Sequence, residues 1–296
     1  MMTKVITKQK DSGFGKAKLL PGNFRAAAIQ MASGPHVDAN LLEAGRLMKM
    51  AANQGAAIIG LPEYFAIMGM KEMDKVKVAE SFGAGPIQDF LSRSAKRLGV
   101  WIIGGSIPLK SDQGNKIRNS CLVYDHKGQC VARYDKIHLF DFQRGAEKYD
   151  ESKTIEPGHQ VVTLDSPFGK IGLSICYDLR FPELYRAMGD CDLIFVPSAF
   201  TETTGKAHWE TLIRARAIEN LSYVIAPAQG GYHMNGRETH GSSMIVDPWG
   251  VVLDRLQRGS GVVIAGVNPI HINELRTSLP ALQHRTLSIQ AQTVKK

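Results

Sequence analysis

A cysteine stands at the end of an apolar run that is typical of a β-strand. The run covers 169–175, and a segment with helical character, 181–188, begins shortly after Cys176. A side chain at such a strand-to-helix turn is held out of the hydrophobic core, which is where a nucleophile has to be. A cysteine taken alone is more often a small buried hydrophobic residue, so this interpretation requires a base, an oxyanion stabiliser and a pocket elsewhere in the chain.

Two charged residues occupy comparable positions. Glu63 follows a short apolar strand predicted at 56–60, and Lys136 follows a strand predicted at 130–134. Sites in α/β proteins lie at the ends of strands. A carboxylate among apolar groups has a raised pKa and suits general-base catalysis, whereas an ammonium can stabilise a developing oxyanion. Glu151 is a second candidate carboxylate. Each of these charged residues, taken alone, is typical of a solvated surface. Only their combination favours a catalytic site.

The same residues permit other kinds of chemistry. Histidine is the usual partner of a catalytic cysteine, so a Cys-His hydrolase stays open through His138, His208 and His240. No protease-type signature surrounds Cys176, however. The chain also lacks the serine-hydrolase elbow, the phosphate loop and the dinucleotide fingerprint, and its cysteines and histidines have no zinc spacing. We therefore expect no metal and no cofactor.

Composition limits the classes of function. The net charge is +8, but much of the excess lies near the two ends of the chain, and no basic stripe is interleaved with aromatic residues. We expect no nucleic-acid partner. No apolar stretch is long enough to span a bilayer, and residues 1–10 lack the apolar core of a secretory signal. The four cysteines suggest no disulfide framework, so we expect a cytoplasmic protein without membrane contact. Cys121, Cys130 and Cys191 are interpreted as structural thiols.

Strand-like and helical segments alternate along most of the chain. Apolar residues at helical spacing predict helices over 38–54, 86–98, 181–188 and 206–220. Short apolar runs bounded by turn residues predict strands, at 24–31, 56–60, 100–104, 120–124, 130–134, 160–164, 169–175, 192–196, 222–228, 242–246, 251–253 and 261–267. No low-complexity linker or tandem repeat interrupts this order. The sequence predicts one α/β domain with mixed sheets and helices on the outside.

Three motifs in this order resemble the nitrilase, or carbon–nitrogen hydrolase, superfamily. They are Leu61-Pro-Glu63, the run 134–140 around Lys136, and the run 176–183 that starts at Cys176. The resemblance covers nearly the whole chain. It implies a four-layer αββα sandwich in which two mixed β-sheets are flanked by helices. It divides the chain into a loose leader at 1–20, a single carbon–nitrogen hydrolase domain at 21–280 and a tail at 281–296.

The resemblance also implies roles for individual residues. Cys176 is then the nucleophile, Glu63 the base that accepts its proton, and Lys136 an oxyanion stabiliser together with the backbone N–H of Tyr177. Glu151 falls where the family has its second catalytic glutamate, which would orient Lys136 and the attacking water. The family usually forms dimers through the helices after the nucleophile and the segment 200–219, which implies a homodimer or a higher even-numbered homo-oligomer.

Further stretches resemble the branch that includes the deaminated glutathione amidases and the ω-amidases. They lie at 198–210, 214–219, 228–233 and 247–250. The run 228–233, followed by Arg237 and 241–243, is closer to the deaminated glutathione amidases. The resemblance implies hydrolysis of the terminal amide of a small carboxylate-bearing metabolite to acid and ammonia, with deaminated glutathione as the first choice. The alternatives are an ω-amidase for 2-oxoglutaramate or 2-oxosuccinamate, another small-amide or nitrile hydrolase, and a non-catalytic binding protein.

Two departures from that branch affect the pocket. The chain has Gly241-Ser242-Ser243 where Gly-His-Ser is expected, and the loop 141–148 differs from the ω-amidase pattern. Loops of this kind determine specificity.

The substrate's carboxylate requires a partner of its own. Arg180 is the candidate, because an arginine fork matches a carboxylate, with an ion pair to Asp178 or Glu183 as the structural alternative. Phe200 and Thr201 are predicted to line the pocket.

Overall fold

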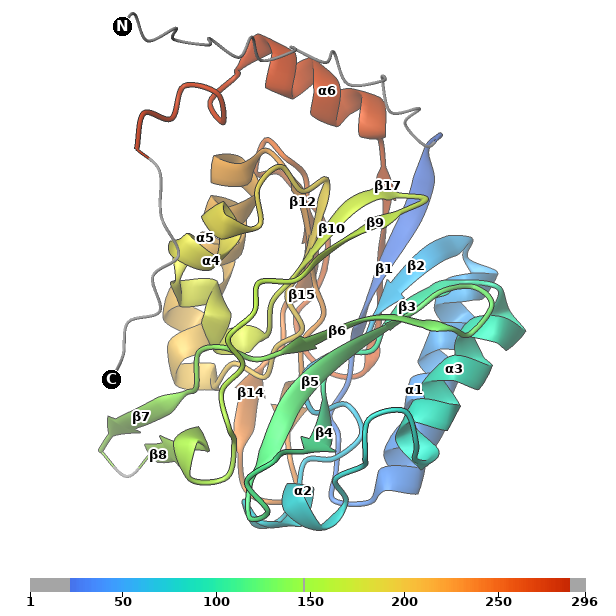
Figure 1. Ribbon diagram of the computed structural model, residues 1–296, viewed down its shortest axis with the longest axis vertical. Coiled ribbons are helices and arrows are strands. Elements are labelled where there is room, and N and C mark those ends of the chain that lie inside the picture. Colours follow the sequence, from blue (N-terminus) through green and yellow to red (C-terminus); the bar gives the residue numbers. More distant parts are fainter. Residues whose placement is uncertain (1–21, 146, 288–296) are drawn as a thin grey trace, which may run out of the picture.

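Two large β-sheets form the centre of the protein, with helices on their outer faces. The computed structural model describes residues 22–145 and 147–287. Figure 1 shows the sheets packed face to face between two groups of helices. The leader predicted at 1–20 and the residues 288–296 of the predicted tail lie outside the described residues.

The first sheet contains the strands that precede Glu63 and Lys136. Its strand order is β17-β1-β2-β3-β5-β4, and β6 also pairs with β5. β1, β2 and β3 are parallel to one another and the other pairings are antiparallel. The strands are β1 (Phe24–Gln30), β2 (Ala56–Gly60), β3 (Trp101–Ile103), β4 (Ile107–Lys110), β5 (Ile117–Tyr124), β6 (Cys130–Asp135) and β17 (Gly261–Val267).

The second sheet contains the strand that precedes Cys176. Its strand order is β16-β15-β12-β11-β10-β9. The three central strands β10, β11 and β12 are parallel, and the outer pairings are antiparallel. The strands are β9 (Thr163–Ser166), β10 (Gly169–Leu173), β11 (Leu193–Phe195), β12 (Tyr223–Ala226), β15 (Ser243–Val246) and β16 (Val252–Leu256).

Strand β1 shows how side-chain alternation builds these layers. Successive side chains of a strand point to opposite faces of its sheet. Ala26 and Ala28 accordingly belong to the core shared with the second sheet, whereas Ala27 and Ile29 belong to the core beneath the helices of the first. All four are fully buried, which explains why this segment reads as a continuous apolar run.

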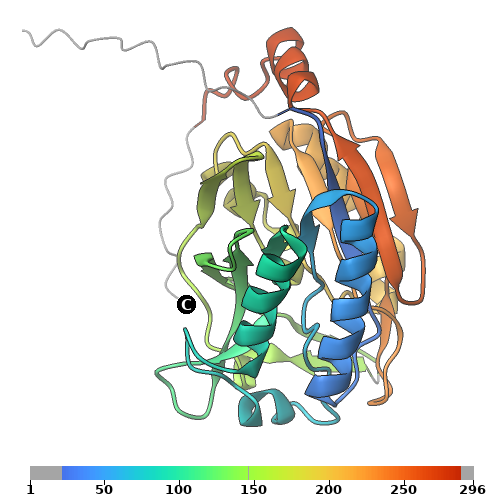
Figure 2. The same ribbon diagram turned by 90° about the vertical axis from the view of Figure 1, so that its right-hand side faces the viewer.

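The helices cover the two outer faces. Figure 2 shows α1 (Val37–Asn53) and α3 (Pro86–Leu98) side by side over the first sheet. α4 (Pro182–Ala187) and α5 (Glu202–Asn220) cover the second sheet on the opposite side of the molecule (Figure 1). The predicted four-layer αββα sandwich is confirmed, with two mixed sheets flanked by helices.

Several short elements complete the fold. Two small antiparallel hairpins are formed by β7 (Asp141–Arg144) with β8 (Glu147–Asp150) and by β13 (Gly230–Tyr232) with β14 (Glu238–His240). The remaining helices are α2 (Asp74–Lys77), α6 (Pro269–Ser278) and the 3₁₀ helices η1 (Glu151–Lys153) and η2 (Cys176–Arg180). Over the described part of the chain, none of the helices has both the length and the apolar character needed to cross a membrane.

Candidate active site

Cys176 lies at a strained turn directly after the second sheet. Strand β10 ends at Leu173, and the 3₁₀ helix η2 starts at Cys176 itself. The backbone of Cys176 has φ of +51°, a left-handed conformation that is uncommon for a residue other than glycine. Such conformations persist only where the surrounding structure holds them, and they cluster at functional sites. The predicted strand-to-helix turn is therefore sharper than the sequence indicated.

Asp178 holds this turn in place. One of its carboxylate oxygens accepts hydrogen bonds from the backbone N–H of Ile175 at 2.9 Å and from the Tyr134 hydroxyl at 2.7 Å. The other accepts the backbone N–H of His138 at 3.0 Å. Tyr134 and His138 flank Lys136 in the sequence, so this fully buried carboxylate joins the nucleophile turn to the segment that carries the lysine.

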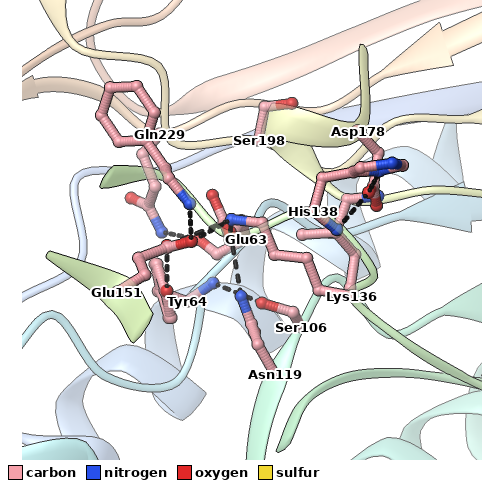
Figure 3. A network of polar contacts seen from close by, with 12 residues as sticks. Glu63, Tyr64, Ser106, Asn119, Lys136, His138, Glu151, Asp178, Ser198 and Gln229 are labelled. Atoms are coloured by element: carbon pink, nitrogen blue, oxygen red, sulfur yellow. Dashed lines mark hydrogen bonds and ion pairs between the residues drawn. The ribbon is translucent and has the colours of Figure 1, made fainter. Parts of the chain in front are cut away.

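Lys136 is shared by the two candidate carboxylates. Its ammonium nitrogen lies 2.9 Å from Oε1 of Glu63, and 3.1 Å and 2.8 Å from the two carboxylate oxygens of Glu151 (Figure 3). The side chains of Lys136 and Glu63 are almost completely buried. Glu63 after β2, Lys136 after β6 and Glu151 in η1 lie far apart in the sequence and thus form one charged cluster.

Neutral groups complete the coordination of both carboxylates. The Asn119 side chain donates to Oε1 of Glu63 at 2.9 Å. Glu151 accepts hydrogen bonds from the Tyr64 hydroxyl at 2.7 Å and from the backbone N–H of Phe140 at 2.8 Å. Glu63 and the Cys176 thiol lie close enough to influence each other's pKa. Glu63 therefore contacts the lysine and lies beside the thiol, an arrangement suited to proton transfer from sulfur.

The electrostatics of the cluster follow from burial. Burial raises the pKa of Glu63, and the attraction of Lys136 offsets this only in part. Burial also raises the pKa of the Cys176 thiol, and the neighbouring Glu63 charge raises it further. For Lys136, burial alone would lower the pKa, but the Glu151 and Glu63 carboxylates outweigh it and hold the pKa well above the ordinary value. The lysine is thus a permanent cation, and the cysteine rests as a neutral thiol beside a base.

Glu151 differs from Glu63 in its protonation. Burial would raise its pKa, but the charges of Lys136 and Lys75 together with the hydrogen bonds from Lys136 and Phe140 lower the pKa below the ordinary value. Two carboxylates on one lysine are therefore pushed in opposite directions, which is typical of acid–base sites. Glu151 remains ionised, and Glu63 is the carboxylate that can exchange a proton.

The backbone behind Glu63 is held by residues that the sequence did not identify. The Gln229 side-chain amide donates to the backbone carbonyl of Glu63 at 3.0 Å and to the Ser33 hydroxyl at 2.8 Å. Gly105 has φ of +56°, and a Cβ at this position would lie 2.2 Å from the carbonyl oxygen of Pro62. Gln229 lies in the run 228–233. The resemblance of this run to related amidases was the only signal in the sequence that could have identified Gln229.

Comparison with known proteins identifies the family that has this fold and these motifs. The family model described as carbon–nitrogen hydrolase matches residues 25–277. The chain belongs to the carbon–nitrogen hydrolase family. The resemblance based on the motifs around Glu63, Lys136 and Cys176 is thereby confirmed.

Two curated relatives and one solved structure describe the similarity within the family. A deaminated glutathione amidase of Synechocystis sp. is 45% identical over 268 residues, which are 88% of this chain and 98% of the relative. A human omega-amidase is 36% identical over 93% of this chain and 99% of its own length. The structure of Saccharomyces cerevisiae Nit3, a member of branch 10 of the nitrilase superfamily, matches with a TM-score of 0.81 and 28% identity, over 92% of this chain and 99% of that one.

These relatives establish the class of reaction. The protein is a hydrolase that acts on carbon–nitrogen bonds other than peptide bonds, and it is an amidase. This agrees with the enzyme class expected from the sequence. A non-catalytic binding protein is no longer an alternative.

The structure does not support the Cys-His interpretation. His138 Nδ1 lies 2.7 Å from Asp178 and its ring stacks on Phe181 with centroids 3.7 Å apart. The ring nitrogens of His208 and His240 contact Arg180 and Glu202, at 3.2 Å and 3.0 Å. The charged groups that act on the Cys176 thiol are Glu63, Lys136 and Glu151, in agreement with the amide-hydrolase interpretation.

The substrate-binding candidates occupy different environments. The Arg180 guanidinium lies over the rings of Phe200 at 5.4 Å and Tyr177 at 5.8 Å. Within the described ranges Arg180 has no ion pair with Asp178 or with Glu183, and its guanidinium contacts Nδ1 of His208 at 3.2 Å instead. The Thr201 hydroxyl accepts the backbone N–H of Thr204 at 3.2 Å and caps helix α5, so this side chain has a structural role in addition to the predicted one.

No group of three or more His, Cys, Asp or Glu side chains within 22–145 and 147–287 is arranged to hold a metal ion.

The raised pKa of Glu63 predicts the pH dependence of this amidase. A Glu63 that acts as the base must be ionised to accept the thiol proton, so kcat/KM is then expected to rise with pH through the pKa of Glu63 in the free enzyme. Because burial raises that pKa, the midpoint of the acid limb should lie above about 4.3, the value of an ordinary glutamate. The measurement is kcat/KM from pH 4 to 9 on a cleaved amide, at about ten pH values.

Two variants control this measurement. Glu63→Gln should lower kcat/KM by about 10²- to 10⁴-fold and remove the acid limb, whereas Glu274→Gln on helix α6 should reproduce the wild-type profile. A midpoint at or below that of an ordinary glutamate would contradict the assignment. The same conclusion follows if the residual activity of Glu63→Gln keeps an unchanged acid limb.

Proposed function

We propose that this amidase uses Cys176 as its nucleophile, with Glu63, Lys136 and Glu151 as further catalytic residues. The observation that carries the proposal is the buried lysine held between two carboxylates, one of which also lies beside the Cys176 thiol. Burying two acids around one cation stabilises a fold poorly, because the desolvation penalty offsets the attraction. Strongly perturbed pKa values in such a cluster are typical of catalysis.

The first half of the reaction releases the amine. Glu63 takes the proton of Cys176, and the thiolate forms a bond to the amide carbon. The carbonyl electrons move to oxygen, and the resulting oxyanion is stabilised by the Lys136 ammonium and by the backbone N–H of Tyr177. Tyr177 is the second residue of η2, and the first N–H groups of a helix lack an intrahelical acceptor. Protonated Glu63 then donates to the leaving nitrogen, the carbon–nitrogen bond breaks and a thioester remains.

The second half regenerates the thiol. Glu63, again ionised, takes a proton from water, and the hydroxide adds to the thioester carbon. The oxyanion forms in the same position and collapses to the carboxylic acid, while Cys176 leaves as thiolate and recovers its proton from Glu63. One group acts as base and then as acid in each half, which requires a pKa close to the working pH. Glu151 stays ionised throughout and orients the lysine and the water.

Deaminated glutathione is the substrate that we propose. A curated relative of this name is 45% identical along almost its whole length. The compound is a 2-oxo acid joined through an amide to cysteinylglycine, so it has no primary amide. Its cleavage at that amide releases an amine, whereas 2-oxoglutaramate releases ammonia. Arg180, which has no carboxylate partner in the described part of the chain, is proposed to bind the carboxylate next to the oxo group, with Phe200 and Thr201 beside it.

A substrate panel tests this choice. We expect kcat/KM for deaminated glutathione to exceed that for 2-oxoglutaramate, 2-oxosuccinamate and a simple nitrile by about tenfold or more, equivalent to about 1.4 kcal/mol of transition-state binding. The 2-oxo acid product and the released amine or ammonia are both quantified. A preference for 2-oxoglutaramate would identify an ω-amidase instead, and a preference for the nitrile would overturn the amide assignment.

Arg180→Gln tests the carboxylate contact with the same panel. It should raise KM for every 2-oxo acid amide and leave a neutral amide unaffected. An equal loss of kcat/KM on charged and neutral amides would assign Arg180 a structural role.

The cellular setting and the assembly remain proposals. The four cysteines within the described ranges are free thiols, which supports a reducing cytoplasmic compartment. A homodimer or a higher even-numbered oligomer is proposed through the region of α4 and α5, and a monomer measured by light scattering would contradict it.

A further inference from the structure

Arg237 lies near the catalytic cluster but has no part in the mechanism above. It ends the turn between β13 and β14 and approaches the β7–β8 hairpin, where its guanidinium lies 4.7 Å from the centre of the Tyr149 ring. Its Nη1 atom is 3.6 Å from the Met68 sulfur. The neighbours of this cation are therefore an aromatic ring and a thioether rather than acids.

The acids closest to Arg237 are committed elsewhere. Glu63 and Glu72 act on Arg237 electrostatically, but Glu63 pairs with Lys136 at 2.9 Å and Glu72 with Lys75 at 2.6 Å. No carboxylate of the described residues lies within ion-pairing distance of Arg237, and its Nε atom is buried without a hydrogen-bond partner. A buried donor left unpaired is destabilising. This position is thus poorly explained by stability and well suited to an anionic ligand.

Arg237 and Arg180 lie at opposite ends of one row of aromatic side chains. Tyr149, beneath Arg237, is 5.5 Å from Phe140, and Phe140 is 5.1 Å from Tyr177, measured between ring centres. The Arg180 guanidinium follows at 5.8 Å from Tyr177. Tyr177 is adjacent to the nucleophile, and the backbone N–H of Phe140 binds Glu151. The candidate nucleophile is therefore next to a ring of this row, and each end of the row has an arginine without a carboxylate partner among the described residues.

We propose that Arg237 binds a second substrate carboxylate, located on the amine side of the amide that is cleaved. Arg180 binds the carboxylate on the acyl side, so the preferred substrates are dianionic amides in which an amino acid or short peptide with a free carboxylate is the leaving group. This rests on the proposed function and deepens it. Arginine suits the task because its planar fork pairs with a carboxylate through two hydrogen bonds.

The first experiment uses the unmodified enzyme and two forms of one substrate. Deaminated glutathione is compared with its derivative in which the glycine carboxylate is converted to an uncharged amide. We expect kcat/KM for the free acid to be about 10- to 100-fold higher, which is the effect of one hydrogen-bonded contact to a charged group. Equal kcat/KM values for the two forms would overturn the inference. Because only the unmodified enzyme is used, this result does not depend on whether a variant folds.

The second experiment assigns the contact to Arg237. Arg237→Gln should raise KM for deaminated glutathione by the same 10- to 100-fold factor, change kcat little, and leave KM unchanged for the amidated derivative and for 2-oxoglutaramate. Arg180→Gln should instead raise KM for all three. Arg93→Gln, on the exposed face of α3, is the control for removal of an arginine charge.

The outcomes separate the inference from the function on which it rests. Equal losses on all three substrates in Arg237→Gln would show a structural role and overturn the inference. If the unmodified enzyme cleaves deaminated glutathione but does not distinguish the two forms, the inference fails and the proposed function stands. If it does not cleave deaminated glutathione at all, both fail.

Discussion

Cys176→Ala is expected to reduce amide hydrolysis by at least about four orders of magnitude, because the proposed thioester forms on this thiol. The fold should be retained. Alanine removes only the thiol at this site, where the turn is held by Asp178 through backbone and side-chain contacts. The measurements are kcat/KM for deaminated glutathione and the thermal unfolding midpoint of the variant. We expect a change in the free energy of unfolding of about 1 kcal/mol or less.

A matched cysteine supplies the control. Cys130→Ala changes an exposed thiol on β6 and should keep the wild-type rate. Normal turnover by Cys176→Ala would overturn the assignment of the nucleophile. If Cys176→Ala were inactive and also much less stable, its rate could reflect unfolding. Cys176→Ser keeps the shape of the side chain and is therefore measured beside it. We expect this variant to be strongly impaired as well.

Lys136→Met is expected to damage both activity and stability. It removes the only cation that contacts Glu63 and Glu151 within the described residues, so two carboxylates remain buried against each other. We expect kcat to fall by about 10²- to 10³-fold through loss of oxyanion stabilisation. Removing one partner of a buried ion pair destabilises a protein by about 3–5 kcal/mol, and we expect a loss of this size near pH 7.

The pH dependence of that loss has a definite sign. Without the lysine, burial and mutual repulsion raise the pKa values of both carboxyl groups in the folded variant above those in the unfolded chain. The folded variant then binds more protons than the unfolded chain, so its stability increases as the pH falls through that range. Denaturant unfolding at pH 5 and pH 7.5 measures the difference. Lys153 is exposed and pairs with Asp150, so the stability of Lys153→Met should show no such dependence on pH.

A stable Lys136→Met variant at neutral pH would contradict the charge state assigned to the cluster. The two carboxylates could then share a proton in the wild-type enzyme, and Glu151 would not be held ionised by the lysine.

Local patterns in the sequence were sufficient for the main elements. The apolar spacing of 86–98 predicts α3 with the observed bounds, Pro86 occupies the first helical turn and Gly99 ends the helix in a left-handed conformation. The strand-end positions of Glu63, Lys136 and Cys176 also agree with the structure. Each of these features depends on residues close together in the chain, which is why a single sequence contains them.

Short strands and late helices were missed for a physical reason. β7 and β8 have four residues each and pair only with each other, so they have little periodicity and no buried face to indicate them. Helix α6 has only two buried residues, Pro269 and Ile272. The predicted start of α5 at 206 was also late, because its actual cap, Thr201, precedes a stretch of polar residues.

The sequence by itself determined which residue types are available and the order in which they follow strands, and through its motifs it determined the family. Only the tertiary structure decided which charged groups contact one another, because Glu63, Glu151 and Lys136 meet across segments that are distant in the chain. Charge–charge energies and pKa values depend on separations of a few ångströms and on exclusion of water, and neither is a local property of the sequence. The same holds for Arg237, whose lack of a carboxylate partner exists only in three dimensions.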